Sequence, residues 1–202
     1  MDETWKPEEN DVVDKYILFS PLSTSTFHSL ISSNAPNESR TILFTQVLEG
    51  LAFLHHQGIS HRDIKPANLT VKSYDPPLAQ IIDFGSATAE NRILYDYPGT
   101  IPYLAPEQCE NQYHGCHVDY WACALVGIQI LGYRISNSQV NEKDFRKIHN
   151  WLGDNPIYPI AICCKAMLQW EPDDRMTADY ALQYHLAQYR VTSDTKKRML
   201  IE

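Results

Sequence analysis

The sequence has no hydrophobic run long enough to cross a membrane and no excess of positive charge. Its longest mostly apolar run, residues 121–131, includes Gln129, and a membrane-spanning helix needs about 20 residues. A formal net charge of -8 at pH 7 leaves little basic surface for phosphate groups. The first five residues include two acids and no basic flank, unlike a secretory signal peptide. We therefore expect no nucleic-acid partner, no membrane partner and no secretion.

Cysteine is scarce, and its pattern excludes a disulfide framework. The count of five is odd, which favours reduced thiols and a cytoplasmic or nuclear location. Four residues of zinc-ligand type fall within nine positions: Cys109, His114, Cys116 and His117. They lack the paired spacing of zinc sites. We expect loop thiols and surface histidines there.

The sequence does have enough apolar residues for one hydrophobic core, with 44% hydrophobic content in 202 residues. In the first half, apolar residues recur at helical spacing up to Gly58: Leu43, Val47, Leu51 and Leu54. This predicts a core-facing helix with Asn37 or Ser39 as its cap. Two β-like runs, 69–71 and 80–82, predict a small hairpin.

The second half is predicted to be irregular first and helical afterwards. Proline and glycine interrupt residues 85–118, which argues against regular structure. Asp119 is then expected as the N-cap of an apolar helix over 120–131 that ends at Gly132. Two more helical patterns follow, at residues 157–169 and 177–189. The sequence thus predicts one mainly helical unit with a small β element.

The chemically informative stretch is His-Arg-Asp-Ile-Lys-Pro-Ala-Asn at residues 61–68, followed by Asp83-Phe84-Gly85. It brings together two carboxylates, one amine and one amide: Asp63, Asp83, Lys65 and Asn68. Such a set suits the binding of a divalent metal and a phosphate while a hydroxyl is deprotonated. Alone, Asp-Phe-Gly would be typical of a simple turn.

With Gly99-Thr100, Ala105-Pro106-Glu107 and Arg175 in this order, the sequence resembles the C-terminal lobe of eukaryotic serine/threonine protein kinases. The resemblance implies an α+β, kinase-like fold, of which this chain is mainly α: a helical C-lobe with a small β-hairpin at the catalytic loop. It divides the chain into a polar N-terminal extension (1–15), the lobe (16–190) and a polar C-terminal tail (191–202). Within the lobe it implies a hinge (20–22), a catalytic loop (61–68) and an activation segment (83–107).

The resemblance also implies a role for each site residue, with ATP and Mg²⁺ as cofactors. Asp63 would be the catalytic base toward a serine or threonine hydroxyl of a protein substrate. Asn68 and Asp83 would be the magnesium ligands, and Lys65 would steady the transferring phosphate. Thr100 would hydrogen-bond near Asp63 and Lys65 and shape the acceptor position, which favours Ser/Thr over Tyr.

Other matches imply architectural roles. Glu107 and Arg175 would form a buried ion pair, with an exposed surface pair as the alternative. Asp119 would hold the backbone around His61 and Arg62.

Arg62, just before the expected base, implies control by a negative charge in the activation segment. No Ser or Thr occurs between residues 89 and 98. The candidates are therefore phosphorylated Tyr95 or Tyr97, or a fixed acid, Asp96 or Glu90. We favour the fixed acid.

Several parts of a complete kinase do not occur in the sequence before the catalytic loop. The first glycine is Gly50, so no Gly-x-Gly-x-x-Gly precedes it, and Lys6 and Lys15 lack the Val-Ala-Ile-Lys context. Residues 16–19 resemble the last strand of the small lobe, and Thr70 replaces the usual bulky residue beneath adenine. We expect feeble or no autonomous activity, and self-association or a partner chain that covers the exposed lobe interface.

Two functions follow from these features. The first is a protein serine/threonine kinase that transfers the γ-phosphate of ATP if it is complete or complemented by another chain. The alternative is a weak or inactive truncated kinase, a pseudokinase, that acts as a protein-interaction module. The presence of Asp63, Lys65, Asn68 and Asp83 together argues for the first, because a scaffold has no physical need of all four.

Overall fold

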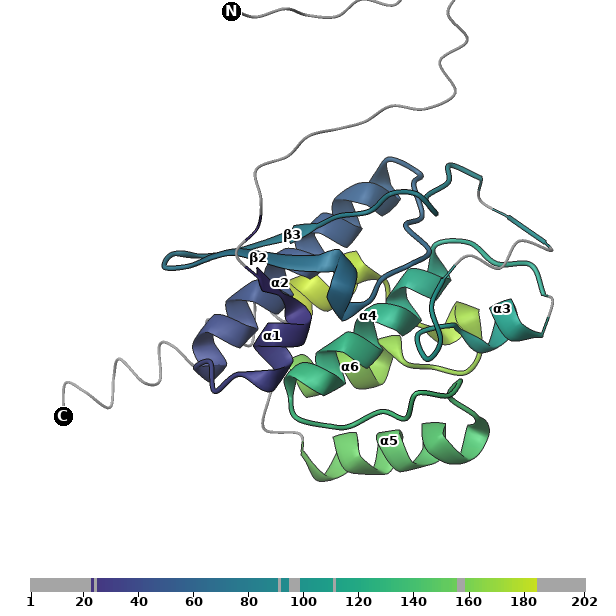
Figure 1. Ribbon diagram of the computed structural model, residues 1–202. Coiled ribbons are helices and arrows are strands. Elements are labelled where there is room, and N and C mark those ends of the chain that lie inside the picture. The colour runs from purple at the N-terminus through teal and green to yellow at the C-terminus, as the bar shows by residue number, and fades with distance from the viewer. Residues whose placement is uncertain are drawn as a thin grey trace, which may run out of the picture.

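The computed structural model describes residue 23 and residues 25–90, 92–94, 99–110, 112–155 and 159–184. The described part is mainly helical with one small sheet (Figure 1). The strand expected at 16–19, the hinge at 20–22 and both polar ends, 1–15 and 191–202, lie outside the described residues.

Helix α2 (Asn37–His56) has the apolar face that the spacing predicts, with Leu43, Val47, Leu48 and Leu51 buried. It is followed by Gly58 at a positive φ of 71°, as expected for a glycine beyond a helix C-terminus. The predicted cap is wrong. Pro36 is the N-cap residue and makes no side-chain cap bond, whereas Asn37 and Ser39 already lie inside the helix, where a capping backbone conformation is not available.

The sheet has the strand order β1-β2-β3, and all pairings are antiparallel. Strands β2 (Leu69–Tyr74) and β3 (Pro77–Ile81) form the predicted hairpin. β2 continues beyond the predicted run 69–71, and β3 begins and ends before the predicted run 80–82 does. The third strand, β1 (Ser25–Thr26), pairs with β2 and was not predicted. The hairpin lies across α2 (Figure 1).

Helix α4 (His117–Ile130) lies at the centre of the core, and all but two of its residues are buried. Its end before Gly132, at φ 99°, matches the prediction. Its start does not: Cys116 is the N-cap residue and Asp119 lies in the first turn. The Asp119 side chain is directed to the catalytic loop instead of to its own helix.

The remaining helices surround α4 (Figure 1): α1 (Phe27–Ser32), α3 (Pro106–Cys109), α5 (Glu142–Asp154) and α6 (Pro159–Met167). α6 matches part of the pattern at 157–169, and residues 178–184 are helical within the pattern at 177–189. α5 was not predicted, and α3 interrupts the stretch expected to be irregular. Two 3-10 turns complete the order, η1 (Pro66–Asn68) and η2 (Pro172–Asp174).

No helix in the described ranges is both long and apolar enough to span a bilayer.

The five cysteines are free thiols. Across the described residues, no three or more His, Cys, Asp or Glu side chains are grouped so as to hold a metal ion. His114 is not the surface histidine that the sequence suggested. It is 5% exposed, and its backbone pairs with Ile93 in an isolated β-bridge.

Candidate active site

The catalytic loop is fixed by a buried carboxylate on α4. Asp119 Oδ2 accepts a hydrogen bond from His61 N at 2.8 Å, and Oδ1 accepts one from Arg62 N at 2.7 Å. Arg62 has a positive φ of 65°, which is unfavourable for a residue with a side chain. The two hydrogen bonds hold the backbone in this bend, and the expected role of Asp119 thus has matching geometry.

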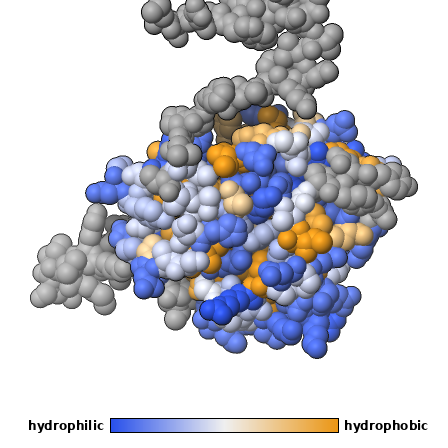
Figure 2. All heavy atoms as spheres, in the orientation of Figure 1, coloured by the Kyte–Doolittle hydropathy of each residue, from blue (hydrophilic) through white to orange (hydrophobic). Residues whose placement is uncertain are grey.

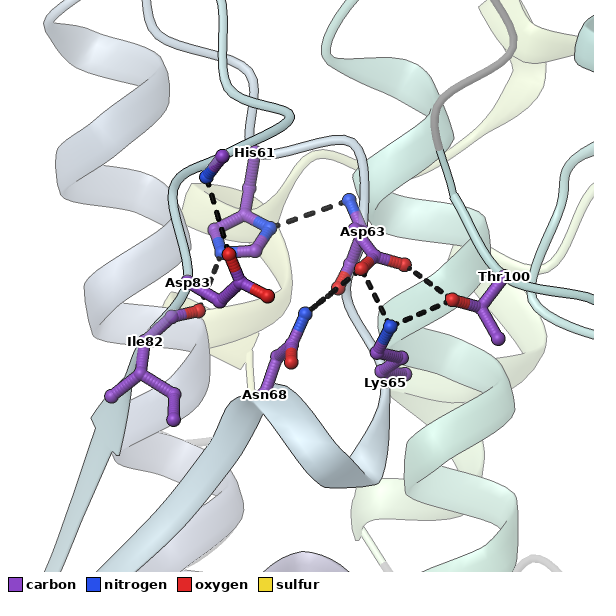
Figure 3. A network of polar contacts seen from close by, with 8 residues as sticks. His61, Asp63, Lys65, Asn68, Ile82, Asp83 and Thr100 are labelled. Atoms are coloured by element: carbon purple, nitrogen blue, oxygen red, sulfur yellow. Dashed lines mark hydrogen bonds and ion pairs between the residues drawn. The ribbon is translucent and has the colours of Figure 1, made fainter. Parts of the chain in front are cut away.

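Asp63, Lys65 and Thr100 form a closed triangle of hydrogen bonds (Figure 3). Lys65 Nζ donates to Asp63 Oδ2 and to Thr100 Oγ1, each at 2.7 Å. Thr100 Oγ1 donates in turn to Asp63 Oδ1 at 2.8 Å. The side chains of Asp63 and Lys65 are 12% and 21% exposed, so a carboxylate and an ammonium meet at a partly solvated surface.

Asn68 completes the cluster from η1. Its Nδ2 donates to the backbone oxygen of Asp63 at 2.9 Å and to Asp63 Oδ2 at 3.0 Å. Because both partners can only accept, the orientation of the amide is settled. The Oδ1 oxygen of Asn68 is therefore left for another partner.

Asp83 lies directly after the backbone contact that joins β3 to the catalytic loop. Ile82 N donates to Asn68 O at 2.9 Å, and Asp83 itself has a positive φ of 63°. Its exposed carboxylate accepts one hydrogen bond, from Gly85 N at 3.3 Å. Carboxylate and amide oxygens are the ligands that Mg²⁺ prefers, so the oxygens of Asn68 and Asp83 fit this ion.

His61 links the two loops that carry these ligands. Its Nε2 donates to Ile82 O at 3.0 Å, and its Nδ1 accepts from Asp63 N at 3.3 Å. The ring also meets Phe84 edge-on, with centroids 5.1 Å apart. The side chain of His61 is fully buried, which couples the position of Asp63 to that of the Asp83 segment.

Thr70 stands where the resemblance to kinases implies a bulky apolar residue beneath adenine, and its surroundings are polar. It is buried in β2, where its hydroxyl donates to Gln80 O at 3.3 Å and accepts from Ser23 Oγ at 2.9 Å. Its polar atom is therefore satisfied within the sheet. A threonine in place of the bulky apolar residue is therefore stabilised by local hydrogen bonds.

The activation segment is joined to the catalytic loop by backbone pairing. Ser60 and Thr88 exchange two hydrogen bonds, of 2.9 and 3.0 Å, and Arg62 Nε donates to Ser86 O at 2.6 Å. Of the charge candidates, Glu90 is exposed. Tyr95, Asp96 and Tyr97 lie outside the described residues, so the fixed acid stays a prediction.

Glu107 and Arg175 form the buried ion pair, and the surface alternative is wrong. The two guanidinium nitrogens lie 2.5 and 2.8 Å from the two carboxylate oxygens. The side chains are 2% and 0% exposed. Arg175 also donates to the backbone oxygens of Gln169, Trp170 and His117. One charge pair thereby joins the end of the activation segment to three other segments.

One residue of this network carried no signal in the sequence. His55, at the end of α2, places Nε2 at 2.8 Å from Asp119 Oδ2. Because 64 positions separate the two residues, only the tertiary structure shows the contact. The residues of the linear motifs, by contrast, are named by the resemblance of the sequence to kinases.

Comparison with known proteins agrees with this geometry. The model of the family described as "Protein kinase domain" matches residues 9–187. The Drosophila melanogaster serine/threonine-protein kinase grp is 29% identical over 181 residues, covering 83% of this chain and 35% of that protein. The Schizosaccharomyces pombe serine/threonine-protein kinase chk1 is 39% identical over 93 residues, covering 44% and 18%. For chk-1 of Caenorhabditis elegans the identity is 37% over 128 residues, covering 52% and 25%. The chain thus spans about a third or less of the length of these relatives.

Proposed function

The chain belongs to the protein kinase family, and on this premise we propose that it transfers the γ-phosphate of ATP to serine or threonine hydroxyls of proteins. The observation that supports this most strongly is the triangle of Asp63, Lys65 and Thr100. It holds a proton acceptor and a cation at fixed positions, which is what phosphoryl transfer needs from a protein.

We assign one step of the transfer to each member of the cluster. Asp63 takes the proton of the acceptor hydroxyl as that oxygen attacks. The ammonium group of Lys65, 2.7 Å from Asp63 Oδ2, stabilises negative charge on the transferring phosphoryl group. Thr100 orients both side chains. The oxygens of Asn68 and Asp83 would hold Mg²⁺, which supplies charge neutralisation at the phosphates when bound.

Binding is the first test, because it does not depend on turnover. Melting of the 202-residue chain is measured with and without ATP and Mg²⁺, for the wild type and for Asp83→Asn. A ligand at 100 times its dissociation constant stabilises by about 2.7 kcal/mol, and 1 kcal/mol corresponds to about 2–4 °C at this size. We expect a magnesium-dependent rise that Asp83→Asn abolishes and that Asp75→Asn, at an exposed hairpin position, retains. No rise at millimolar ATP would contradict the proposal.

Transfer is the second test. Labelled phosphate is followed from ATP to peptides that differ only in Ser, Thr or Tyr. Asp63→Asn is expected to reduce the rate roughly 10²–10⁴-fold, the usual contribution of a catalytic base. Labelling of the Tyr peptide alone would contradict the assignment of Thr100.

An exposed apolar cavity favours the alternative, a weak or inactive kinase that binds other proteins. A cavity of about 340 Å³ lies between α2 and β3, with Phe53 and Phe84 at its lining. These rings are 63% and 49% exposed, and an open apolar surface of this kind is typical of a protein contact. Nucleotide binding without transfer, with association that Phe53→Ser weakens in sedimentation, would support this function.

A further inference from the structure

The cavity of about 340 Å³ between α2 and β3 has an apolar lining that is open to solvent. Its apolar lining residues are Val47, Gly50, Phe53, Leu54, Ala79, Ile81 and Phe84. Water in contact with such a lining is unfavourable, because apolar surface is stabilised when it leaves water. A continuous exposed apolar surface of this kind marks a contact with another apolar group.

The described chain begins beside this cavity. Ser23 Oγ donates to Thr70 Oγ1 at 2.9 Å, and Thr70 Oγ1 donates in turn to Gln80 O at 3.3 Å. Gln80 is one of the lining residues. Two successive hydrogen bonds therefore connect Ser23 with the wall of the cavity, across β2 and β3. The residues that precede Ser23 join the fold at this wall.

Those preceding residues, 1–22, lie outside the described residues and include four consecutive apolar ones, Tyr-Ile-Leu-Phe at 16–19. An extended chain spans at most about 3.3–3.6 Å per residue, so Phe19 reaches up to about 13 Å from Ser23 and Tyr16 up to about 25 Å. Neighbouring strands are about 4.8 Å apart, and β3 lies against α2 (Figure 1). Both walls of the cavity are therefore within reach of residues 16–19.

The backbone edge of β3 favours contact through side chains over the addition of a strand. Gln46 of α2 already occupies this edge: its Nε2 donates to Pro77 O at 3.1 Å, and its Oε1 accepts from Ala79 N at 2.7 Å. A strand added there would have to displace both hydrogen bonds. Apolar side chains need no hydrogen-bond partner and can enter the cavity without this loss.

We propose that residues 16–19 pack their side chains into the cavity of the same chain, on Phe53 and Phe84. A short flexible connection gives an effective concentration in the millimolar range. If the separate segment binds with a dissociation constant of about 0.1 mM, the connected segment occupies the cavity in about nine of ten chains.

This packing has a consequence for partner binding. A second copy or another protein that uses the cavity must first displace residues 16–19, so their packing opposes association through this surface. The consequence rests on the alternative function proposed above, in which the cavity binds other proteins, whereas the packing itself does not.

The test is methyl NMR spectroscopy of the 202-residue chain with ¹³C-labelled isoleucine methyl groups. We expect nuclear Overhauser contacts from the Ile81 methyl groups to the ring protons of Tyr16 and Phe19. A second sample mixes labelled chains that have deuterated aromatic rings with unlabelled chains. Contacts in this mixture can form only between copies, and we expect none.

Variants on both sides locate the contact. Leu18→Asp places a charge within the segment and should abolish the contacts, whereas Thr4→Asp adds the same charge outside it and should retain them. On the cavity side, Phe53→Ser should weaken the contacts. Its matched control is Tyr180→Ser, which removes a 67% exposed ring elsewhere and should leave them unchanged.

A separate peptide of residues 14–22 measures the competition. It should bind the Leu18→Asp chain with a dissociation constant on the order of 0.1 mM, seen as a saturable shift of the Ile81 methyl resonances. The wild type should bind it about tenfold more weakly, because its own segment already occupies the cavity.

Three results would overturn the proposal. They are a wild-type chain without contacts between Ile81 and the two rings, contacts in the mixed sample, which assign the cavity to a second copy, and equal peptide binding by wild type and Leu18→Asp. If Leu18→Asp does not melt cooperatively, the mixed sample and the Phe53 and Tyr180 variants decide. None of these readouts requires ATP or phosphoryl transfer, so this inference fails or holds independently of the proposed function.

Discussion

At the scale of single residues, the ion pair of Glu107 and Arg175 should contribute far more to stability than the exposed pairs. Glu107→Gln leaves the guanidinium of Arg175 buried without a counter-charge, which typically lowers the free energy of unfolding by about 3–5 kcal/mol. The matched control is Glu142→Gln, which removes a pair with Arg146 whose side chains are 69% and 75% exposed, typically worth under about 1 kcal/mol. Urea unfolding measures both, and equal losses would contradict the difference in burial.

Thr100 allows a test of the triangle that leaves both charged residues in place. Thr100→Val keeps the volume but removes the hydroxyl that joins Lys65 to Asp63. Hydrogen bonds to charged groups contribute about 1.5–3 kcal/mol, so kcat/KM for a Ser peptide should fall roughly 10–150-fold. Thr100→Ser retains the hydroxyl and should stay close to the wild type. If Thr100→Val stays active while Thr100→Ser loses activity, the methyl group and not the hydrogen bonds is what matters.

The site residues differed in how far the sequence predicts them. Asp63, Lys65, Asn68 and Asp83 belong to two short linear motifs, so the resemblance to kinases names them without any information on the tertiary structure. The hydrogen bond of His55 with Asp119 depends on how α2 packs on α4, and no local pattern encodes it. Asp119 had two predictions. Its residue type suggested a helix cap, which is wrong, whereas the resemblance to kinases implied contacts with the backbone around His61 and Arg62, and the hydrogen bonds match that geometry.

At the scale of elements, two helical glycines should respond in opposite ways to alanine. A Cβ at Gly127 in α4 would lie 2.3 Å from Cys164 Sγ and 2.9 Å from the Phe44 ring, so α4 could no longer pack as closely on α6. Overpacking usually costs about 1–3 kcal/mol, which exceeds the gain of up to about 1 kcal/mol in helix propensity. Gly127→Ala should therefore lower the free energy of unfolding.

Gly153 in α5 is the matched control, because its Cβ would meet only Lys165 Nζ at 3.6 Å, an ordinary contact. Gly153→Ala should raise the free energy of unfolding by up to about 1 kcal/mol. Denaturant midpoints measure both variants. A stabilised Gly127→Ala chain would show that Cys164 and Phe44 yield at little cost.

The elements themselves were predictable where periodicity is strong. α2 was found from apolar spacing, α4 from a long apolar run and the hairpin from two β-like runs. By contrast, β1 has two polar residues, Ser25 and Thr26, and exists as a strand only through its pairing with β2. α5 did offer a local signal that was missed. Asn141 caps it by accepting from Asp144 N at 3.1 Å, and its buried residues Ile148 and Leu152 stand four positions apart.

At the scale of the whole molecule, polar and apolar surface are unevenly distributed. The face in Figure 2 is mostly hydrophilic, with separate hydrophobic patches. The net charge of -8 keeps copies of the chain apart by repulsion, whereas the cavity between α2 and β3 favours association. The ionic strength should decide which effect prevails, because salt screens the repulsion without weakening apolar contact.

Acid sensitivity should also be a property of the whole fold, set by half-buried histidines. Burial lowers the pKa of His117, and Arg175 lowers it further. Burial also lowers the pKa of His149, although its Nε2 donates to Leu168 O. Below the ordinary histidine pKa of about 6.5, the unfolded chain then binds more protons than the folded one, so the free energy of unfolding must fall as pH falls.

The test is urea unfolding from pH 7 to 5. The double variant His117→Gln/His149→Gln should show a shallower fall in the free energy of unfolding than the wild type. The difference in slope should correspond to less than one proton per histidine, because both rings are partly solvated. Parallel curves would mean that other groups cause the acid sensitivity, even if the variant is less stable at every pH.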